Sequence, residues 1–180
     1  MDVAITQWIN SLSNHSAVLD AAMVAFTSYG VPFLILIVIA QWWSRQDRLH
    51  VRHTCIAAGL SFLIGLGINQ VILLFVHRVR PYDAGVSQLI IERSGDWSFP
   101  SDHATATFAI AAAFLLHGPK RRGLAFLAVA LLVCFSRVYV GTHYFTDILG
   151  GAATGIIAAV AVRGLYREGT KVDNLLTAVL

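Results

Sequence analysis

Long apolar stretches separated by short charged segments constrain this chain more than any other feature. Hydrophobic residues make up 57% of the sequence and charged residues only 13%, whereas soluble domains average about 25% charged residues. A water-facing surface would need more charges than this chain provides. The sequence therefore predicts a single integral-membrane domain over residues 1–180.

Five of these apolar stretches predict an all-α polytopic helix bundle with five transmembrane helices, at about residues 18–43, 54–76, 103–116, 124–140 and 147–165. The first contains Gly30 and Pro32, and a turn there would give six spans. Neither half would cross a ~30 Å hydrocarbon core at ~1.5 Å per residue. One long, tilted helix with a kink near Pro32 is therefore favoured. The third stretch is short and rich in alanine, so we expect protein to surround it.

Residues 3–12 precede the first apolar stretch and are amphipathic. Ile5, Trp8, Ile9 and Leu12 repeat at helical spacing, and the opposite side is polar. Tryptophan favours the interface between membrane and water. This pattern predicts a short N-terminal helix that lies on the membrane surface.

The distribution of basic residues predicts the orientation in the membrane. With five spans, one side carries the basic residues Arg45, Arg48, Arg52, Lys120, Arg121, Arg122, Arg163, Arg167 and Lys171. The other side carries Arg78, Arg80, Arg93 and Arg137. The positive-inside rule makes the first side cytoplasmic, with the N-terminus outside and the C-terminus inside. Because the basic residues act as topology signals, the net charge of +3 does not indicate binding of nucleic acid.

Three polar islands interrupt the apolar pattern at equivalent boundaries. They are Arg80-Pro81, the segment 100–103 (Pro-Ser-Asp-His) and the segment 136–147. The predicted topology places all three on the outer face. Ionisable residues at membrane depth are costly and indicate function by default, so we expect the three islands to form one phosphate-binding site.

The third island carries a histidine and a carboxylate at helical spacing. His143 and Asp147 are four residues apart, so on one helical turn the carboxylate can accept the imidazole N–H. That hydrogen bond fixes the tautomer and leaves the other ring nitrogen free to attack. Arg137 supplies a planar fork for phosphate oxygens.

The other two islands add a proton donor, an anion site and a cation. Ser101 precedes an apolar helix and is a candidate N-cap, and free N–H groups at such a helix start bind anions. His103 is placed to protonate a leaving oxygen. Arg80 adds a second cation, and Pro81 stiffens its loop.

Other ionisable residues have less specific interpretations. Arginines at a membrane boundary usually contact lipid headgroups, which is the favoured interpretation for Arg78 and Arg93. Four histidines have no partner at a useful spacing and are expected to be solvated, namely His15, His50, His53 and His117.

These islands resemble the three signature motifs of the type 2 phosphatidic acid phosphatase superfamily. The third motif matches fully, as Ser136-Arg137, then His143 and Asp147. The second matches except that Asp102 stands where the family usually has Gly. The first is partial, because Leu73 replaces a Lys seven residues before Arg80, and Arg78 or His77 are candidates to substitute for it. The sequence of residues 98–103 and the missing Lys resemble the bacitracin-resistance (BcrC-type) undecaprenyl diphosphatases. The similarity to this subgroup extends from about residue 14 to residue 150.

The resemblance implies a membrane helix bundle that hydrolyses a polyprenyl diphosphate lipid without a metal or other cofactor. It implies a multi-pass protein of the bacterial cytoplasmic membrane that recycles the lipid carrier of cell-wall synthesis and confers bacitracin resistance. The catalytic residues would be His143 as the nucleophile that forms a phosphohistidine, Asp147 as its orienting partner and His103 as the general acid. The phosphate-binding residues would be Arg80, Ser101, Asp102 and Arg137.

Three alternatives remain open at this point. The same site could hold a metal ion, with His103, His143 and Asp147 as ligands. The substrate could be another lipid phosphate, such as phosphatidate, phosphatidylglycerophosphate or lipid A. A transporter or lipid-binding protein would use the same charges to hold headgroups, but paired inverted repeats or broken helices, which would favour transport, are not evident in the sequence.

Overall fold

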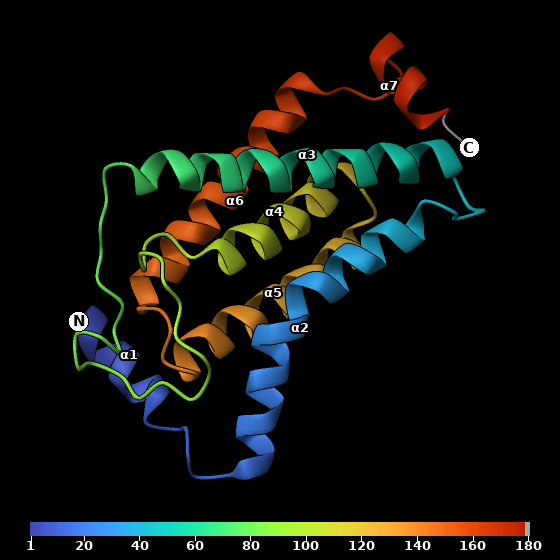
Figure 1. Ribbon diagram of the computed structural model, residues 1–180. Helices are drawn as coiled ribbons and strands as arrows, with labels where there is room; N and C mark the ends of the chain where they lie inside the picture. Colours follow the sequence, from blue (N-terminus) through green and yellow to red (C-terminus); the bar gives the residue numbers. More distant parts are fainter. Residues whose placement is uncertain (179–180) are drawn as a thin grey trace.

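The computed structural model describes residues 1–178 and is all-helical over that range, as expected. Its helices are α1 (Asp2–Asn10), α2 (Ala17–Gln41), α3 (Arg48–Leu73), α4 (Asp102–His117), α5 (Lys120–Tyr139), α6 (Phe145–Leu165) and α7 (Lys171–Thr177). Figure 1 shows α1 and the long loop between α3 and α4 at one end of the bundle and α7 at the other. We call these the α1 end and the α7 end.

Four helices, α2, α3, α5 and α6, are long and apolar enough to cross a membrane. The fifth predicted span corresponds to α4, which has only 16 residues and is too short to meet that criterion. α4 can be this short because it packs against α3, α5 and α6 in the middle of the bundle (Figure 1). Surrounded by protein, as its alanine content predicts, α4 does not need the length of a lipid-facing helix.

Helix α2 is continuous through Gly30 and Pro32, so the alternative of a turn and six spans is wrong. Its ribbon changes direction part-way along its length (Figure 1), in the middle of a helix whose one internal proline is Pro32. Proline removes one hydrogen bond of the helix and pushes the preceding turn aside. The prediction of one kinked helix is therefore confirmed.

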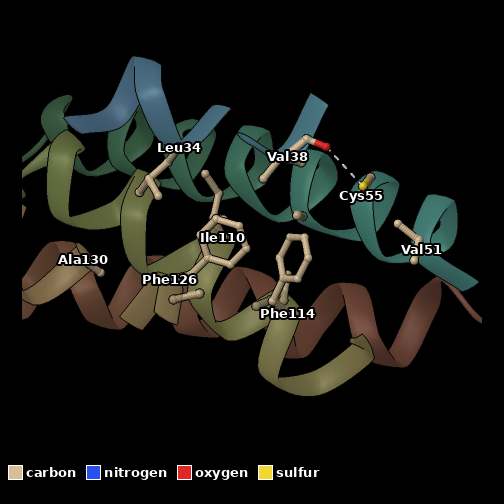
Figure 2. Packing of buried hydrophobic residues seen from close by; sticks show 12 residues of the cluster. Leu34, Val38, Val51, Cys55, Ile110, Phe114, Phe126 and Ala130 are labelled. Carbon is tan, nitrogen blue, oxygen red and sulfur yellow. Dashed lines mark hydrogen bonds between the residues drawn. The ribbon is translucent and has the colours of Figure 1, made fainter. Parts of the chain in front are cut away.

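A large apolar cluster joins α2, α3, α4 and α5 in the half of the bundle near the α7 end. Figure 2 shows Phe114 and Ile110 of α4 between residues of α2, α3 and α5. The rings of Phe114 and Phe126 are 4.5 Å apart between centroids, and the Cys55 thiol donates to the Val38 carbonyl oxygen at 3.4 Å. This packing fixes α4 against its neighbours.

Close approach of α4 and α6 sets the position of the second polar island. A Cβ at Gly151 would overlap the Ser101 carbonyl oxygen, and a Cβ at Gly155 would overlap the Thr105 carbonyl oxygen. The two glycines therefore allow the start of α4 to lie directly against α6. Through this contact the Ser101 N–H donates to the Asp147 carbonyl oxygen at 3.1 Å, which joins the second island to the third.

The α7 end contains a buried polar cluster that the sequence did not predict. His53 Nδ1 lies 2.8 Å from Asp173 Oδ1, and His53 Nε2 lies 2.9 Å from His117 Nδ1. Tyr166 stacks on the His53 ring and donates its hydroxyl to Asp173. The prediction that His53 and His117 are solvated is wrong, because their partners come from helices distant in sequence.

Candidate active site

His143 and Asp147 lie at the junction of α5 and α6 and are fully enclosed. His143 is 3% exposed and Asp147 is 0% exposed. Their side chains approach as predicted, with His143 Nδ1 3.5 Å from Asp147 Oδ2. The shorter contact of His143 Nδ1, however, is to the Ser98 carbonyl oxygen at 2.8 Å. Because both neighbours of Nδ1 are acceptors, Nδ1 carries the proton and Nε2 keeps its lone pair.

Asp147 accepts hydrogen bonds from three further groups. The Ser98 hydroxyl and the Tyr144 N–H, the latter at 2.9 Å, donate to Oδ2. Arg78 Nη1 donates to Oδ1 at 2.6 Å. A buried carboxylate needs such donors to remain charged. The interpretation of Arg78 as a lipid-headgroup contact is therefore wrong, since its guanidinium binds the site carboxylate.

Arg80 is held rigidly next to His143. It is 4% exposed, and its Nη1 donates to the Thr142 carbonyl oxygen at 2.9 Å and lies 3.4 Å from His143 Nε2. Its Nη2 donates to Asp96 Oδ1 at 2.7 Å. The first and third polar islands therefore meet, and Arg80 Nη1 donates a long hydrogen bond to His143 Nε2, the ring nitrogen that carries the lone pair.

Arg137 and Ser101 leave hydrogen-bonding capacity unused in the same region. Arg137 is 8% exposed, and its Nη1 donates to Thr27 Oγ1 at 2.7 Å. Arg137 Nε and Ser101 Oγ are both buried without a partner in residues 1–178. Ser101 occupies the N-cap position of α4, as predicted, but its hydroxyl does not cap the helix. Unpaired buried polar groups are rare, and both atoms are donors of the kind that phosphate oxygens accept from.

His103 and Asp102 occupy the first turn of α4. His103 is within electrostatic range of Arg137, His143 and Arg80, so it faces the same region as the other site residues. Asp102 Oδ1 accepts from Asn69 Nδ2 at 2.7 Å. Its role as a phosphate-binding residue stays a prediction, and an ionised carboxylate would repel the phosphate rather than hold it.

The pKa of His143 is strongly lowered. Burial lowers it most, the Asp147 hydrogen bond raises it, and the charges of Arg137 and Arg80 lower it, which leaves a pKa of about 4. The imidazole is therefore neutral at pH 7, with the Nε2 lone pair available. A neutral, oriented imidazole beside two arginines can attack a phosphorus atom.

In the alternative of a metal site, the ligands would be His103, His143 and Asp147. Within residues 1–178, no three His, Cys, Asp or Glu side chains are grouped so that they could hold a metal ion. The oxygens of Asp147 are instead occupied by Arg78, Ser98 and Tyr144.

Sequence reasoning missed several residues that complete the site. Ser98 has a local signal, because it stands two residues before the second island. Thr27 and Asp2 have none, because they lie more than 100 residues from their partners Arg137 and Thr146. Arg78 is not available to substitute for the cation missing at Leu73, because its two terminal nitrogens bind Asp2, Thr146 and Asp147.

Comparison with known proteins agrees with this geometry. A family model described as the PAP2 superfamily matches residues 54–171. The undecaprenyl-diphosphatase BcrC of Bacillus subtilis is 38% identical over 159 residues, which cover 87% of this chain and 80% of that protein. The putative undecaprenyl-diphosphatase YbjG of Escherichia coli is 30% identical over 134 residues, which cover 74% of this chain and 66% of that protein.

A solved structure extends the comparison to the fold. The crystal structure of a transmembrane PAP2 type phosphatidylglycerolphosphate phosphatase from Bacillus subtilis matches with a TM-score of 0.70 and 25% sequence identity. The match covers 94% of this chain and 86% of that chain. The multi-pass membrane fold is therefore shared over nearly the whole length.

Proposed function

This chain belongs to the PAP2 superfamily, and from that premise we propose that it hydrolyses undecaprenyl diphosphate to undecaprenyl phosphate and inorganic phosphate. The observation that carries the chemistry is the pair of unsatisfied buried donors, Arg137 Nε and Ser101 Oγ, at the end of the bundle that holds His143, where the charge of Arg137 helps to keep His143 neutral. The identity of 38% with BcrC of Bacillus subtilis supports the choice of lipid.

In the proposed reaction, Arg137 and Ser101 bind the oxygens of the terminal phosphate. Arg80, whose donors already bind Thr142, Asp96 and Trp97, contributes its positive charge beside the phosphate. His143 Nε2 attacks its phosphorus atom while the bond to the bridging oxygen breaks. His103 gives its proton to that oxygen, and undecaprenyl phosphate leaves. Water then attacks the phosphohistidine, His103 takes a proton from the water, and inorganic phosphate is released. The arginines mainly position the phosphoryl group and stabilise its charge.

The positive-inside rule supports a location of the reaction at the outer face of the bacterial cytoplasmic membrane. In this arrangement α4 is the third of five crossings, the α1 end faces outward and the α7 end faces the cytoplasm. There the enzyme would recycle the carrier lipid of cell-wall synthesis and so confer bacitracin resistance. No step of this scheme requires nucleic acid, a cofactor or a metal ion.

A substrate panel tests the function. We expect purified protein in detergent, with excess EDTA, to release phosphate from undecaprenyl diphosphate with a higher kcat/KM than from phosphatidate, phosphatidylglycerophosphate or lipid A. His143→Ala protein is the control for phosphatase contamination. A preference for a monophosphate lipid would contradict the proposed substrate, and activity lost on chelation would favour the metal alternative. Binding without hydrolysis would favour the transporter or lipid-binding alternative.

Labelling of single cysteines tests the orientation. Arg93 is in the loop at the α1 end and Arg121 is near the start of α5, and both native cysteines are buried. We expect a membrane-impermeant thiol reagent applied to intact cells to label Arg93→Cys but not Arg121→Cys. The reverse pattern would place the site on the cytoplasmic side.

A further inference from the structure

Arg78 connects the candidate catalytic pair to the first helix of the chain. Its Nη1 donates to Asp147 Oδ1 at 2.6 Å and to Thr146 Oγ1 at 2.7 Å, and its Nη2 donates to Asp2 Oδ2 at 2.6 Å. The guanidinium carbon lies 3.8 Å from the centroid of the Tyr144 ring. Arg78 is thus held on three sides, and its terminal nitrogens are committed to protein rather than to substrate.

Helix α1 supplies acceptors for the start of α6, the helix that carries Asp147. Asp2 Oδ1 accepts from the Thr146 N–H at 3.0 Å, and Thr6 Oγ1 accepts from the Phe145 N–H at 3.0 Å. The first N–H groups of a helix have no partner within the helix, so side chains about 140 residues away in sequence cap this one. Burial alone would raise the pKa of Asp2, but hydrogen bonds from Arg78 and Thr146 lower it below its usual value. Asp2 is therefore an anion at neutral pH.

The backbone of Arg78 also reaches the imidazole through Ser98. The Arg78 carbonyl oxygen accepts from the Ser98 N–H at 2.8 Å. Ser98 in turn accepts from His143 Nδ1 through its carbonyl oxygen and donates its hydroxyl to Asp147. One arginine therefore contacts, directly or through one residue, both members of the catalytic pair.

We propose that Arg78 and Asp2 are positioning residues for the His143–Asp147 pair, so that helix α1 is part of the catalytic unit. This inference rests on the proposed role of His143 as the nucleophile. Arg78 holds Asp147 Oδ1, which leaves Oδ2 directed toward Ser98, Tyr144 and His143. Asp2 holds Arg78 and the first turn of α6 in the required place.

This arrangement acts on the chemical step rather than on binding. Attack by Nε2 makes the imidazole positive, and Asp147 Oδ2 and the Ser98 carbonyl oxygen stabilise that charge only if they keep their positions. The other charged or titratable groups that interact with His143 are Arg80, Arg137 and His103, and in the proposed reaction they act on the phosphate and the leaving oxygen. Loss of Arg78 should therefore lower kcat and leave KM nearly unchanged.

The test compares Arg78→Gln, Arg78→Lys and Asp2→Asn with the wild type, using purified protein in detergent and undecaprenyl diphosphate. Arg78→Gln is expected to lower kcat by about 10- to 100-fold, the size of loss seen when the groups that orient metal-binding side chains are removed. Arg78→Lys keeps a charged donor and should recover most of that loss. Asp2→Asn should lower kcat by about three- to tenfold, since it weakens one charge-assisted bond. KM should change by less than about twofold in all three.

Arg93→Gln is the matched control. Arg93 lies in the same loop and pairs with Asp83 at 3.1 Å, but its side chain is 72% exposed, so both kcat and KM should stay at the wild-type values. The Tm of each variant reports whether it is folded, and Arg78→Lys and Asp2→Asn keep the test decisive if Arg78→Gln does not fold.

Two results would overturn the inference. Wild-type kcat in folded Arg78→Gln would show that Arg78 does not position the pair. A raised KM with unchanged kcat would instead make Arg78 a substrate-binding residue. Failure of the proposed function is distinguished by the wild type and by His143→Ala. If the wild type prefers another lipid phosphate, the same comparison is read on that lipid. If His143→Ala keeps full activity, the nucleophile is wrong and the inference falls with it.

Discussion

The two ends of the helix bundle both bury histidine and aspartate side chains, but they differ in how the hydrogen bonds are completed. At the α7 end, Asp173 accepts from His53, Tyr166 and the Gly169 N–H. His117 bonds to His53, and His117 Nε2 is the one side-chain atom there left without a partner among the residues described. This cluster joins α3, α4 and α7, and nearly all of its hydrogen-bonding groups find partners within it.

At the α1 end, more of the buried hydrogen-bonding groups lack a partner. Three buried side-chain atoms, on Asn69, Ser101 and Arg137, have no partner in residues 1–178. Arg137 is also a buried cation with no carboxylate within 4.0 Å in that part of the chain. Each unsatisfied buried polar group costs about 1–3 kcal/mol. We infer that the α7 end holds helices together. At the α1 end, the unpaired donors Ser101 Oγ and Arg137 Nε agree with the proposed phosphate site.

The largest expected effect separates the two ends by activity. We expect His143→Ala to lower kcat/KM at least about 10³-fold, because the variant lacks the nucleophile of the proposed reaction. Its Tm should stay near that of the wild type. His53→Ala is the matched change at the α7 end, and it should lower Tm while keeping turnover per folded molecule. The measurements are phosphate release and thermal unfolding in the same detergent. Wild-type turnover in His143→Ala would contradict the assignment of catalysis to the α1 end.

Arg137→Met should lower activity and preserve stability. Loss of one charged donor to the transferred phosphate is expected to lower kcat by about 10²- to 10³-fold. Removing a buried cation that lacks a carboxylate partner should leave Tm in phosphate-free buffer equal to or above the wild-type value. Inorganic phosphate should raise Tm in the wild type and not in the variant. A lower Tm with normal turnover would mean that Arg137 serves the fold.

The lowered pKa of His143 predicts a specific dependence of stability on pH. Its pKa is about 4 in the folded protein, against 6.5 as the ordinary value, so the unfolded chain binds the proton more tightly. Protonation of this residue therefore costs the fold nothing above pH 6.5 and destabilises it as the pH falls toward 4, by roughly 3 kcal/mol in total. His143→Gln should flatten the fall in unfolding free energy over this range. An identical slope in both proteins would contradict the assignment.

Asp173→Asn should have the smallest effect and should act on stability alone. Burial raises the pKa of Asp173, but hydrogen bonds from Tyr166 and His53 lower it below the ordinary value of 3.8. Its contribution is therefore present above pH 3.8 and is lost below it. We expect about 1–2 kcal/mol of lost stability at pH 7, a difference that shrinks below pH 3.8, with unchanged kcat. A fall in kcat would show that the cluster at the α7 end affects catalysis, which would contradict the separation of the two ends.

Most of the fold could be predicted from local patterns in the sequence. Apolar runs long enough to cross a membrane gave the helices, and the continuity of α2 through Pro32 followed from length alone. Helix α7 was missed because a polar helix of seven residues leaves no periodic signal. The buried state of His53 was missed for a related reason, because its partner Asp173 is 120 residues away.

In the candidate site, too, contacts between residues close in sequence could be predicted and distant contacts could not. His143 and Asp147 could be paired because only four residues separate them, although His143 lies before the N-cap of α6 and not on a helical turn as expected. The alternation of the helices brought the three polar islands to one end. The contacts of Arg78 could not be predicted, because they depend on the fold of a loop between α3 and α4 and on helix α1. Ser98 likewise contacts His143 through its backbone carbonyl, an interaction that side-chain patterns do not reveal.

The most direct test of the account is to trap the covalent intermediate. Purified protein mixed with undecaprenyl diphosphate labelled in its terminal phosphate is denatured in alkali, which preserves phosphohistidine, and the labelled peptide is mapped. We expect label on the peptide that contains His143 and none on His143→Ala protein. Label retained in His143→Ala, or found on His103 instead, would contradict the assignment of the nucleophile.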